Sequence, residues 1–228
     1  HNAWKSAEPG VLFWDTILRE SVPDCYADLG YRTVSTNPCG EIPLCPYDSC
    51  RLLAINLYSY VVNPFKPDAY FDFDLFKKHV ALAQRIMDDI IDLELEKIER
   101  IMAKIDSDPE NEDVKHTESV LWQKIYKKSG QGRRTGVGIT AEGDMLAALG
   151  LRYGTEEATE FAEKVHQTVA LSAYRSSVEM AKERGAFEVY DSEREKNNPF
   201  INRLREADPE MYEEMKKANI PLYALESG

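Results

Sequence analysis

The spacing of apolar residues changes near residue 72 and divides the chain into two parts. Residues 51–62 are almost all apolar or β-favouring until Asn63-Pro64 ends the run, a pattern that predicts a strand buried on both faces. After residue 72, apolar residues recur at steps of three and four as far as Ile105. This spacing predicts one long helix, continuous or broken, with Asp72 or Asp74 as its N-cap. We therefore predict a helix-rich α/β fold.

Further helical patterns follow in the second part, separated by polar or glycine-containing breaks. The acidic stretch 106–118 is predicted to be a solvated loop. The segment 129–132 is expected to end one helix, Gly150 to follow another as its C′ residue, and Gly185 to end a third. The predicted helices cover residues 121–128, about 140–149, 156–184, about 200–205 and about 209–218.

The first fifty residues are rich in proline and glycine, so we expect turns and short elements there. Residues 11–19 fit either a strand or a helical turn. We divide the chain into a loop-and-strand segment, 1–72, and a helical segment, 73–228, and expect them to form one structural unit.

Charge and hydropathy exclude two classes of function. The chain has 28 Lys and Arg against 40 Asp and Glu, a formal net charge of −12, so a polymeric nucleic acid is not the expected ligand. No apolar run approaches the roughly 18 residues that a membrane span needs. The N-terminus has neither a starting Met nor the pattern of a signal peptide, and it reads as a chain entered partway.

All four cysteines, Cys25, Cys39, Cys45 and Cys50, lie in the first quarter of the chain. Four are too few for a disulfide scaffold, and their spacing does not match the paired hooks of a zinc site, so we predict no metal site. A reducing, cytoplasmic setting is the expectation. There, such a group of cysteines means either ordinary buried thiols or thiol redox chemistry.

The stretch from Thr36 to Leu44 carries the candidate chemistry. In it, Asn37, Cys39 and Glu41 occupy alternate positions. In extended backbone they would project to the same side, placing a thiol between an amide and a carboxylate. The intervening proline and glycine fit a stiff, tightly turned loop. The alternative is a surface turn with an incidental thiol.

The segment 37–44, Asn-Pro-Cys-Gly-Glu-Ile-Pro-Leu, resembles the finger loop of the ribonucleotide reductase large subunit. This form is typical of the adenosylcobalamin-dependent, or class II, members. Three further segments resemble the family in the same order: 8–15, 49–57 with Cys50, and 133–150 with its Arg-Arg-Thr-Gly-Val-Gly-Ile-Thr start. The resemblance implies that the chain is a piece of the ten-stranded α/β barrel of this family.

The resemblance also implies residue roles. Cys39 would hold the transient thiyl radical that removes the ribose 3′-hydrogen, and Glu41 would take the 3′-hydroxyl proton as general base. Asn37 would hold Glu41 and the ribose hydroxyls in register. Cys50 would be one of two thiols that supply the reducing equivalents and end as a disulfide. The implied reaction is the reduction of ribonucleoside di- or triphosphates to deoxyribonucleotides.

Partners of the full-length enzyme follow from the same resemblance. Adenosylcobalamin would generate the radical, a dithiol reductant such as thioredoxin would restore the thiols, and a homodimer is one arrangement left open. No cofactor-binding residue is assigned. The family's second redox cysteine and its phosphate-binding segment lie outside the chain, so we expect the piece alone to be inactive. Cys25 and Cys45 are not at family positions and are expected to be bystanders.

Two other interpretations stay open. The chain could belong to a class I large subunit, which takes its radical from a separate metal-bearing subunit and uses no cobalamin. It could also be a helical interaction module without chemistry. The pair Arg133-Arg134 could bind phosphate, but such a pair more often makes ion pairs in packing, and we favour that interpretation.

Overall fold

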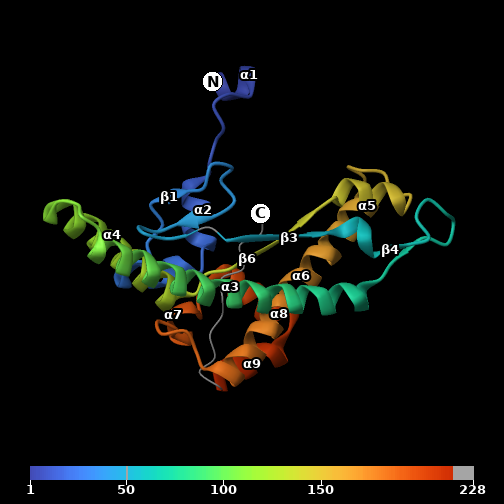
Figure 1. The fold of residues 1–228 in the computed structure, drawn as a ribbon. Helices are drawn as coiled ribbons and strands as arrows, with labels where there is room; N and C mark the ends of the chain where they lie inside the picture. Colours follow the sequence, from blue (N-terminus) through green and yellow to red (C-terminus); the bar gives the residue numbers. More distant parts are fainter. Residues whose placement is uncertain (50, 218–228) are drawn as a thin grey trace.

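The computed structural model describes residues 1–49 and 51–217. At its centre, strand β3 (Leu52–Asn56) pairs in parallel with strand β6 (Gly136–Thr140), and Leu52 lies opposite Gly136. Two long helices, α3 (Phe73–Ser107) and α6 (Glu156–Arg184), pack against each other and cover one face of this pair (Figure 1). The described residues thus form an α/β arrangement rich in helix, and no closed barrel is seen among them.

Helix α3 begins and is oriented as its sequence pattern predicts. The Asp72 carboxylate accepts a hydrogen bond from the Leu75 N–H at 2.9 Å, which confirms Asp72 as the N-cap. Its apolar residues at helical spacing, including Phe76, Val80 and Met87, are fully buried against the sheet and α6. The helix is unbroken to Ser107.

Helix α6 has the bounds that its sequence predicts. Thr155 caps it by accepting a hydrogen bond from the Ala158 N–H at 3.3 Å. It ends at Gly185, whose φ of +86° is a conformation that glycine adopts without steric cost. The buried Val165 and Val169 bring its inner face to the sheet.

The main core contains residues from both halves of the sequence. Ile55 and Val137 extend from the strands, and Met145 comes from helix α5 (Glu142–Ala148). Beside them, the ring of Phe76 makes edge contacts with those of Tyr60 and Phe71 at centroid distances of 4.9 and 5.2 Å. Residues before and after position 72 therefore share one hydrophobic core.

The strand predicted over residues 51–62 is shorter than expected, and one of its faces is open. β3 ends at Asn56, whose side chain accepts a hydrogen bond from the Tyr58 N–H and starts a 3₁₀ turn over Leu57–Tyr60. Ile55 faces the core, whereas Leu52 on the other face is 48% exposed. The expectation of burial on both faces is therefore wrong for the part of the chain that the structure describes. Among the described residues, no second layer covers that face of the sheet.

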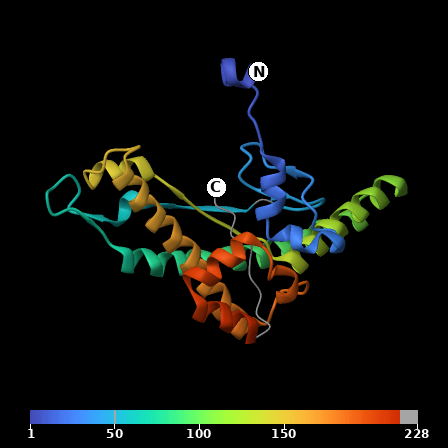
Figure 2. The same cartoon turned by 180° about the vertical axis from the view of Figure 1, so that it is seen from behind.

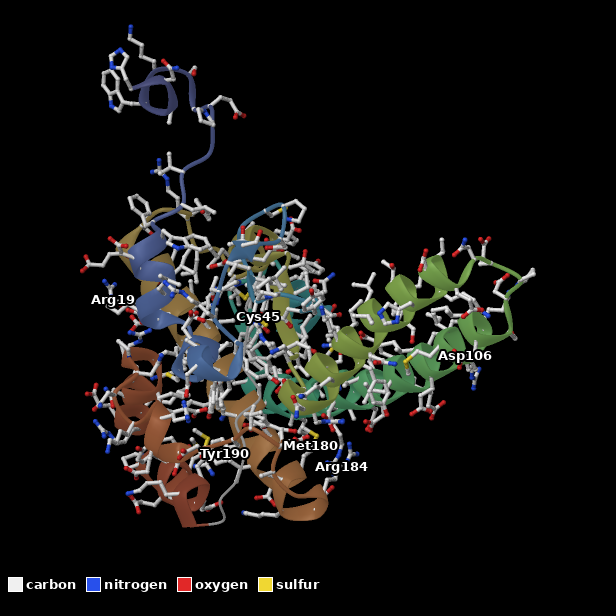
Figure 3. The ribbon with its side chains drawn as sticks, turned by 90° about the vertical axis from the view of Figure 1, so that its left-hand side faces the viewer. Arg19, Cys45, Asp106, Met180, Arg184 and Tyr190 are labelled. Carbon is white, nitrogen blue, oxygen red and sulfur yellow. The ribbon has the colours of Figure 1, made fainter. Side chains whose placement is uncertain are left out.

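Helix α4 (Glu112–Gly132) folds back along α3, where the sequence predicted a loop over 106–118 and a break over 129–132. Both predictions are wrong for the residues that α4 contains. Asn111 caps the helix by accepting the Asp113 N–H at 2.8 Å, and acidic residues in the first turn suit the helix dipole. At the other end, Gly132 packs so closely on Tyr31 that a Cβ would lie 2.8 Å from that ring. Tertiary packing overrides the low helix propensity there. Figure 3 shows Asp106 near the far end of this pair of helices.

Shorter elements surround the core. Helices α8 (Pro199–Ala207) and α9 (Pro209–Lys217) pack against α6 (Figures 1 and 2). The N-terminal arm carries helix α1 (Asn2–Ser6) away from the body in both views. The remaining elements are α2 (Trp14–Glu20), a 3₁₀ turn (Pro23–Leu29), β1 (Ser35–Thr36), β2 (Pro43–Leu44), β4 (Val61–Val62), β5 (Tyr70–Phe71) and α7 (Ser192–Glu195).

Several of these elements test the sequence predictions directly. Residues 14–19 are helical, which decides between the strand and the helical turn expected over 11–19. Gly150 follows α5 with a φ of +77°, as expected for a residue that ends a helix. Of the helices in residues 1–49 and 51–217, none combines the length and apolar character that crossing a bilayer requires.

A buried carboxylate joins the N-terminal segment to α7. The Tyr26 hydroxyl donates a hydrogen bond to Glu195 Oε1 at 2.5 Å, and the Glu195 residue is 2% exposed. Burial raises the pKa of Glu195 to about 7, although the bond from Tyr26 acts in the opposite direction. The carboxyl group therefore keeps its proton in the folded state well above the pH at which it ionises in the unfolded chain.

Stability should depend on pH through Glu195. The folded state binds more protons than the unfolded state between pH 4.5, the ordinary pKa of a glutamate, and about 7, so the free energy of unfolding should fall as pH rises through this window and then level off. Glu195→Gln should remove this loss, gaining up to about 3 kcal/mol at pH 8 and little at pH 4. Urea unfolding at both pH values measures the difference. Glu193→Gln, on the same helix and exposed, is the control, and an equal pH response from both variants would contradict the assignment.

The uncovered face of the β3/β6 sheet should drive self-association of the separate chain, since exposed strand edges and apolar faces pair readily. Leu52→Lys should reduce the association measured by light scattering. Leu29→Lys is the matched control, because Leu29 is 46% exposed but belongs to the 3₁₀ turn Pro23–Leu29 and not to the sheet. A monodisperse monomer at all concentrations would overturn the expectation.

Candidate active site

The three residues of the Asn-x-Cys-x-Glu motif lie together at the tip of a short hairpin. Strands β1 and β2 are antiparallel, with Ser35 opposite Leu44. The backbone N–H of Asn37 donates to the Ile42 carbonyl at 3.2 Å and extends the pairing towards the tip. The loop from Asn37 to Ile42 therefore carries Cys39 and Glu41 on one compact turn.

This loop is tightly turned, as predicted, but it is not extended. The Gly40 N–H donates to the Asn37 carbonyl at 3.0 Å, so Pro38 and Cys39 are the central residues of a β-turn. Proline suits the first of these positions because its φ is already set. The argument that alternate residues project to one side requires extended backbone, so it does not apply through this turn.

Gly40 is required by both its backbone and its surroundings. Its φ is +85°, a region that strains other residues, and a Cβ at this position would lie 2.9 Å from Leu12 Cδ2. Leu12 therefore rests on the tip of the hairpin. The glycine of the motif has a structural reason in addition to any catalytic one.

The side chains of the motif have different surroundings. Cys39 is a free, exposed thiol. The Asn37 Oδ1 accepts a hydrogen bond from the Ile42 N–H at 2.9 Å, so this amide oxygen braces the loop. Glu41 is half-buried, and its Oε2 is buried without a hydrogen-bond partner among the described residues. A buried carboxylate oxygen in that state is costly, and a hydroxyl of a bound ligand would satisfy it.

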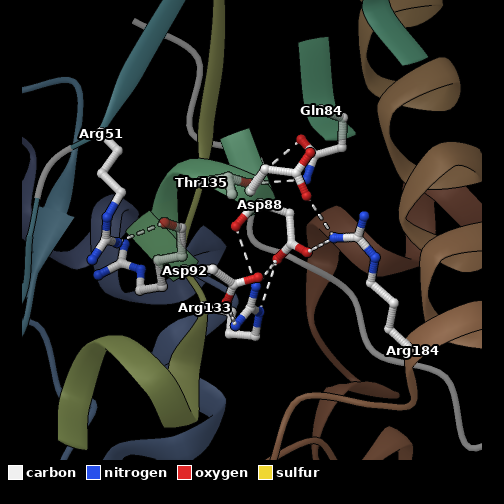
Figure 4. A network of polar contacts seen from close by, with 9 residues as sticks. Arg51, Gln84, Asp88, Asp92, Arg133, Thr135 and Arg184 are labelled. Carbon is white, nitrogen blue, oxygen red and sulfur yellow. Dashed lines mark hydrogen bonds and ion pairs between the residues drawn. The ribbon is translucent and has the colours of Figure 1, made fainter. Parts of the chain in front are cut away.

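Two arginines that precede β6 make ion pairs, which confirms the interpretation favoured from the sequence. Arg133 Nε donates to Asp88 at 2.8 Å and its Nη1 to Asp92 at 2.7 Å (Figure 4). Arg134 pairs with Asp48, and its Nη2 donates to the Pro43 carbonyl at 2.8 Å. Burial lowers the pKa of Arg134 to about 10.

One cluster of carboxylates has the composition of a metal site. Asp88, Asp89 and Asp92 each offer an oxygen within 4.8 Å of the others. Arg133 and Arg184 already donate to these oxygens, with Arg184 Nη1 at 2.8 Å from both Asp88 and Asp89 (Figure 4). The cluster therefore acts as the acidic part of an ion-pair network linking α3, α6 and the start of β6.

The other cysteines differ from Cys39. Cys45 is buried, and burial raises the pKa of both Cys25 and Cys45, which disfavours their reactive thiolate form. Figure 3 shows Cys45 within the packed body. The prediction for Cys50 falls outside the described residues.

Sequence reasoning missed two residues that support this region. Arg51 is 8% exposed, and its guanidinium contacts Glu94, donates to the Arg134 carbonyl at 2.9 Å and donates to Ser129 Oγ at 2.8 Å. Asp48 was not singled out either. The signal available for Arg51 was its place at the start of a predicted buried strand, where a charged residue needs partners.

The family model for the ribonucleotide reductase barrel domain matches residues 1–219 of the chain. The chain belongs to the ribonucleotide reductase family. The hairpin at residues 35–44 carries the segment that resembles the family's finger loop, and it is called the finger loop below.

Curated relatives within the family extend well beyond this chain. A vitamin B12-dependent ribonucleoside-diphosphate reductase from Thermoplasma acidophilum is 36% identical over 195 residues, covering 85% of this chain and 21% of the relative. A protein of the same name from Mycobacterium tuberculosis (strain CDC 1551 / Oshkosh) is 31% identical over 193 residues, covering 84% and 23%. A ribonucleoside-diphosphate reductase subunit alpha from Chlamydia pneumoniae is 28% identical over 159 residues, covering 68% and 12%. The chain thus spans about a fifth of the first two relatives.

Gly40→Ala should destabilise the finger loop by about 1–2 kcal/mol, because alanine is strained at a positive φ and its Cβ would clash with Leu12. Urea unfolding measures the change. Adding Leu12→Ala should relieve the clash but not the backbone strain. Gly10→Ala is the control, since nothing lies within 4 Å of its added Cβ. Equal stability of the Gly40 and Gly10 variants would argue against the turn described here.

Proposed function

We propose that the longer protein containing this chain, called the parent protein below, reduces ribonucleotides to deoxyribonucleotides with Cys39 as the radical-carrying thiol. The observation that carries the proposal is the finger loop itself. In a member of the ribonucleotide reductase family, it presents an exposed thiol two residues from a carboxylate with an unsatisfied buried oxygen.

The chain would form a central piece of the ten-stranded α/β barrel of this family. Parallel pairing of β3 with β6 and helices on one face support this placement, and the open face around Leu52 would receive the rest of the barrel. Segments 1–72 and 73–228 would act as one unit, because Ile55 and Tyr60 share a core with α3 and α6.

Cys39 would exchange a hydrogen atom with the ribose. The thiyl sulfur takes hydrogen from C3′, forming an S–H bond and leaving the radical on carbon; the similar strengths of the two bonds let the step reverse. Adenosylcobalamin, when bound to the parent protein, would supply the organic radical that takes the hydrogen from this thiol. The exposure of Cys39 at the hairpin tip fits exchange with groups outside this chain. We assign no residue of the chain to cofactor binding.

Glu41 and Asn37 would act on the hydroxyl groups. Glu41 Oε2 would accept the 3′-hydroxyl proton, which helps the 2′-hydroxyl leave as water, and its buried, unsatisfied state suits a hydrogen bond from a ligand hydroxyl. The Asn37 oxygen is engaged by Ile42, so its amide N–H₂ group is the part that would donate to the substrate or to Glu41.

Cys50 and a cysteine outside the chain would supply two electrons and become a disulfide, which a dithiol such as thioredoxin would reduce. Substrates would be ribonucleoside di- or triphosphates, and the name of the Thermoplasma relative favours diphosphates. Free thiols at Cys25, Cys39 and Cys45 fit a reducing cytoplasm. A homodimer is the quaternary arrangement that we propose to test.

A class I reductase is the alternative, favoured by the similarity to the subunit alpha from Chlamydia pneumoniae. In that case the radical would come from a separate subunit. The B12-dependent names of the relatives from Thermoplasma and Mycobacterium favour the class II proposal.

Cys39→Ser in the parent protein should reduce deoxynucleotide formation to background, because an O–H bond is too strong for a serine to carry the radical. Glu41→Gln should lower the rate by about 10²–10⁴-fold, since it removes the base. Cys50→Ser should still allow the early radical step on the substrate but should block turnover, because the thiol pair that supplies the two electrons is incomplete and the disulfide cannot form. The assay measures deoxynucleotide per enzyme with adenosylcobalamin and dithiothreitol.

Cys25→Ser is the matched control and should retain activity, since Cys25 has no role in the proposed chemistry. Wild-type activity from Cys39→Ser would remove the radical proposal and favour an interaction module. Nucleotide reduction that does not require adenosylcobalamin but requires a second subunit would assign the parent protein to class I.

A further inference from the structure

A buried ion pair lies under the finger loop. The side chains of Arg134 and Asp48 are only 6% and 5% exposed, and they contact each other directly. The same guanidinium donates through Nη2 to the Pro43 carbonyl at 2.8 Å. The Arg134 guanidinium therefore binds the chain at two places, the Pro43 carbonyl in β2 and the Asp48 carboxylate shortly after β2.

The backbone at Arg134 is held by hydrogen bonds from Arg51 and Gln84. Its carbonyl accepts a hydrogen bond from Arg51 at 2.9 Å, and the next residue, Thr135, accepts one from Gln84 of α3 at 3.0 Å. Figure 4 shows Thr135 and Gln84 facing each other beside the Arg133 network. The backbone at Arg134 is thus anchored to Arg51 and, through Thr135, to α3, and the guanidinium extends from there to the hairpin.

The hairpin depends on outside support. β1 and β2 share only two residue pairs, and a two-stranded ribbon of that length is marginal in water. Pro43 lies four positions from Cys39 in the sequence. Holding Pro43 and Asp48 therefore restricts where the thiol at the tip can lie relative to the sheet.

Stability alone does not account for this pair. Removing two charges from water is expensive, and a well-packed apolar pair often stabilises a protein equally well. What an apolar pair cannot do is hold a carbonyl and a carboxylate at once, as the planar fork of arginine does. The Asp48 carboxylate adds to this geometry by accepting the Ser49 N–H at 2.9 Å.

We propose that Arg134 and Asp48 are positioning residues for Cys39. They set the place of the hairpin tip relative to the β3/β6 sheet without touching the substrate. The proposal rests on the proposed function of Cys39 for its catalytic meaning, but the placement of the thiol can be measured separately.

The main test is the double variant Arg134→Met with Asp48→Leu in the parent protein. Removing both charges leaves no unpaired buried charge, so the melting temperature should stay within a few degrees of wild type. We expect kcat to fall at least about tenfold with KM changed less than about twofold, because the substrate still binds while the thiol is misplaced. Arg134→Lys keeps the charge but loses the fork, and should lower kcat by a smaller factor.

Arg133→Met is the control, because Arg133 bonds to Asp88 and Asp92 of α3. It should lower the melting temperature and leave kcat per folded enzyme unchanged. An equal loss of kcat in this control, or an unchanged kcat in the double variant, would overturn the proposal.

A second readout follows the thiol directly. Alkylation of Cys39 by iodoacetamide, measured peptide by peptide by mass spectrometry, should change at least about threefold in the double variant relative to Cys25 in the same sample. It should not change in Arg133→Met. Altered alkylation with a dispensable Cys39 would uphold the positioning and overturn the proposed function. If Cys39 is essential but its alkylation and kcat are unaltered in the double variant, the proposed function is upheld and the positioning role of Arg134 and Asp48 is overturned.

Discussion

Parallel pairing of β3 with β6 is the contact on which the rest of the structure depends. It joins residues 52–56 to residues 136–140, two segments separated by the whole of α3 and α4. Parallel strands need a long crossover connection, and here the crossover is helical and packs back onto one face of the strands. The same pairing brings Arg134, just before β6, beneath the hairpin that precedes β3.

Buried charge is concentrated where the elements meet. Arg51, Arg133 and Arg134 each reach carboxylates or carbonyls that belong to other elements. Each of these side chains would be costly if it lost its partners, so the network tolerates few alternative arrangements. A short hairpin with little core of its own thereby obtains a defined position on a helical body.

The two faces of the sheet differ in a way that agrees with the extent of the chain. One face is closed by α3 and α6, and the other exposes Leu52. The relatives from Thermoplasma and Mycobacterium are about four times as long as this chain. An open apolar face is what a domain shows when part of its structure lies elsewhere in the sequence.

Much of the fold and the motif could be predicted from the sequence because those features depend on neighbouring residues. Helical periodicity with a capping residue is local, and both Asp72 and Gly185 act where the pattern placed them. The tight turn at Pro38 and Gly40 is local as well. The family resemblance rests on the same short segments, and the match over residues 1–219 confirms it.

Tertiary contacts decided what local patterns could not. Residues 129–132 favour a break, yet they are helical because Gly132 packs on Tyr31 from a distant part of the chain. The open face of β3 and the partners of Arg134 likewise depend on which segments meet in space. The sequence by itself determined most of the helices, the tight turn and the family, but not the extent of α4. Only the tertiary structure decided how the finger loop is held, because burial and ion pairing between distant residues leave no periodic signal in the chain.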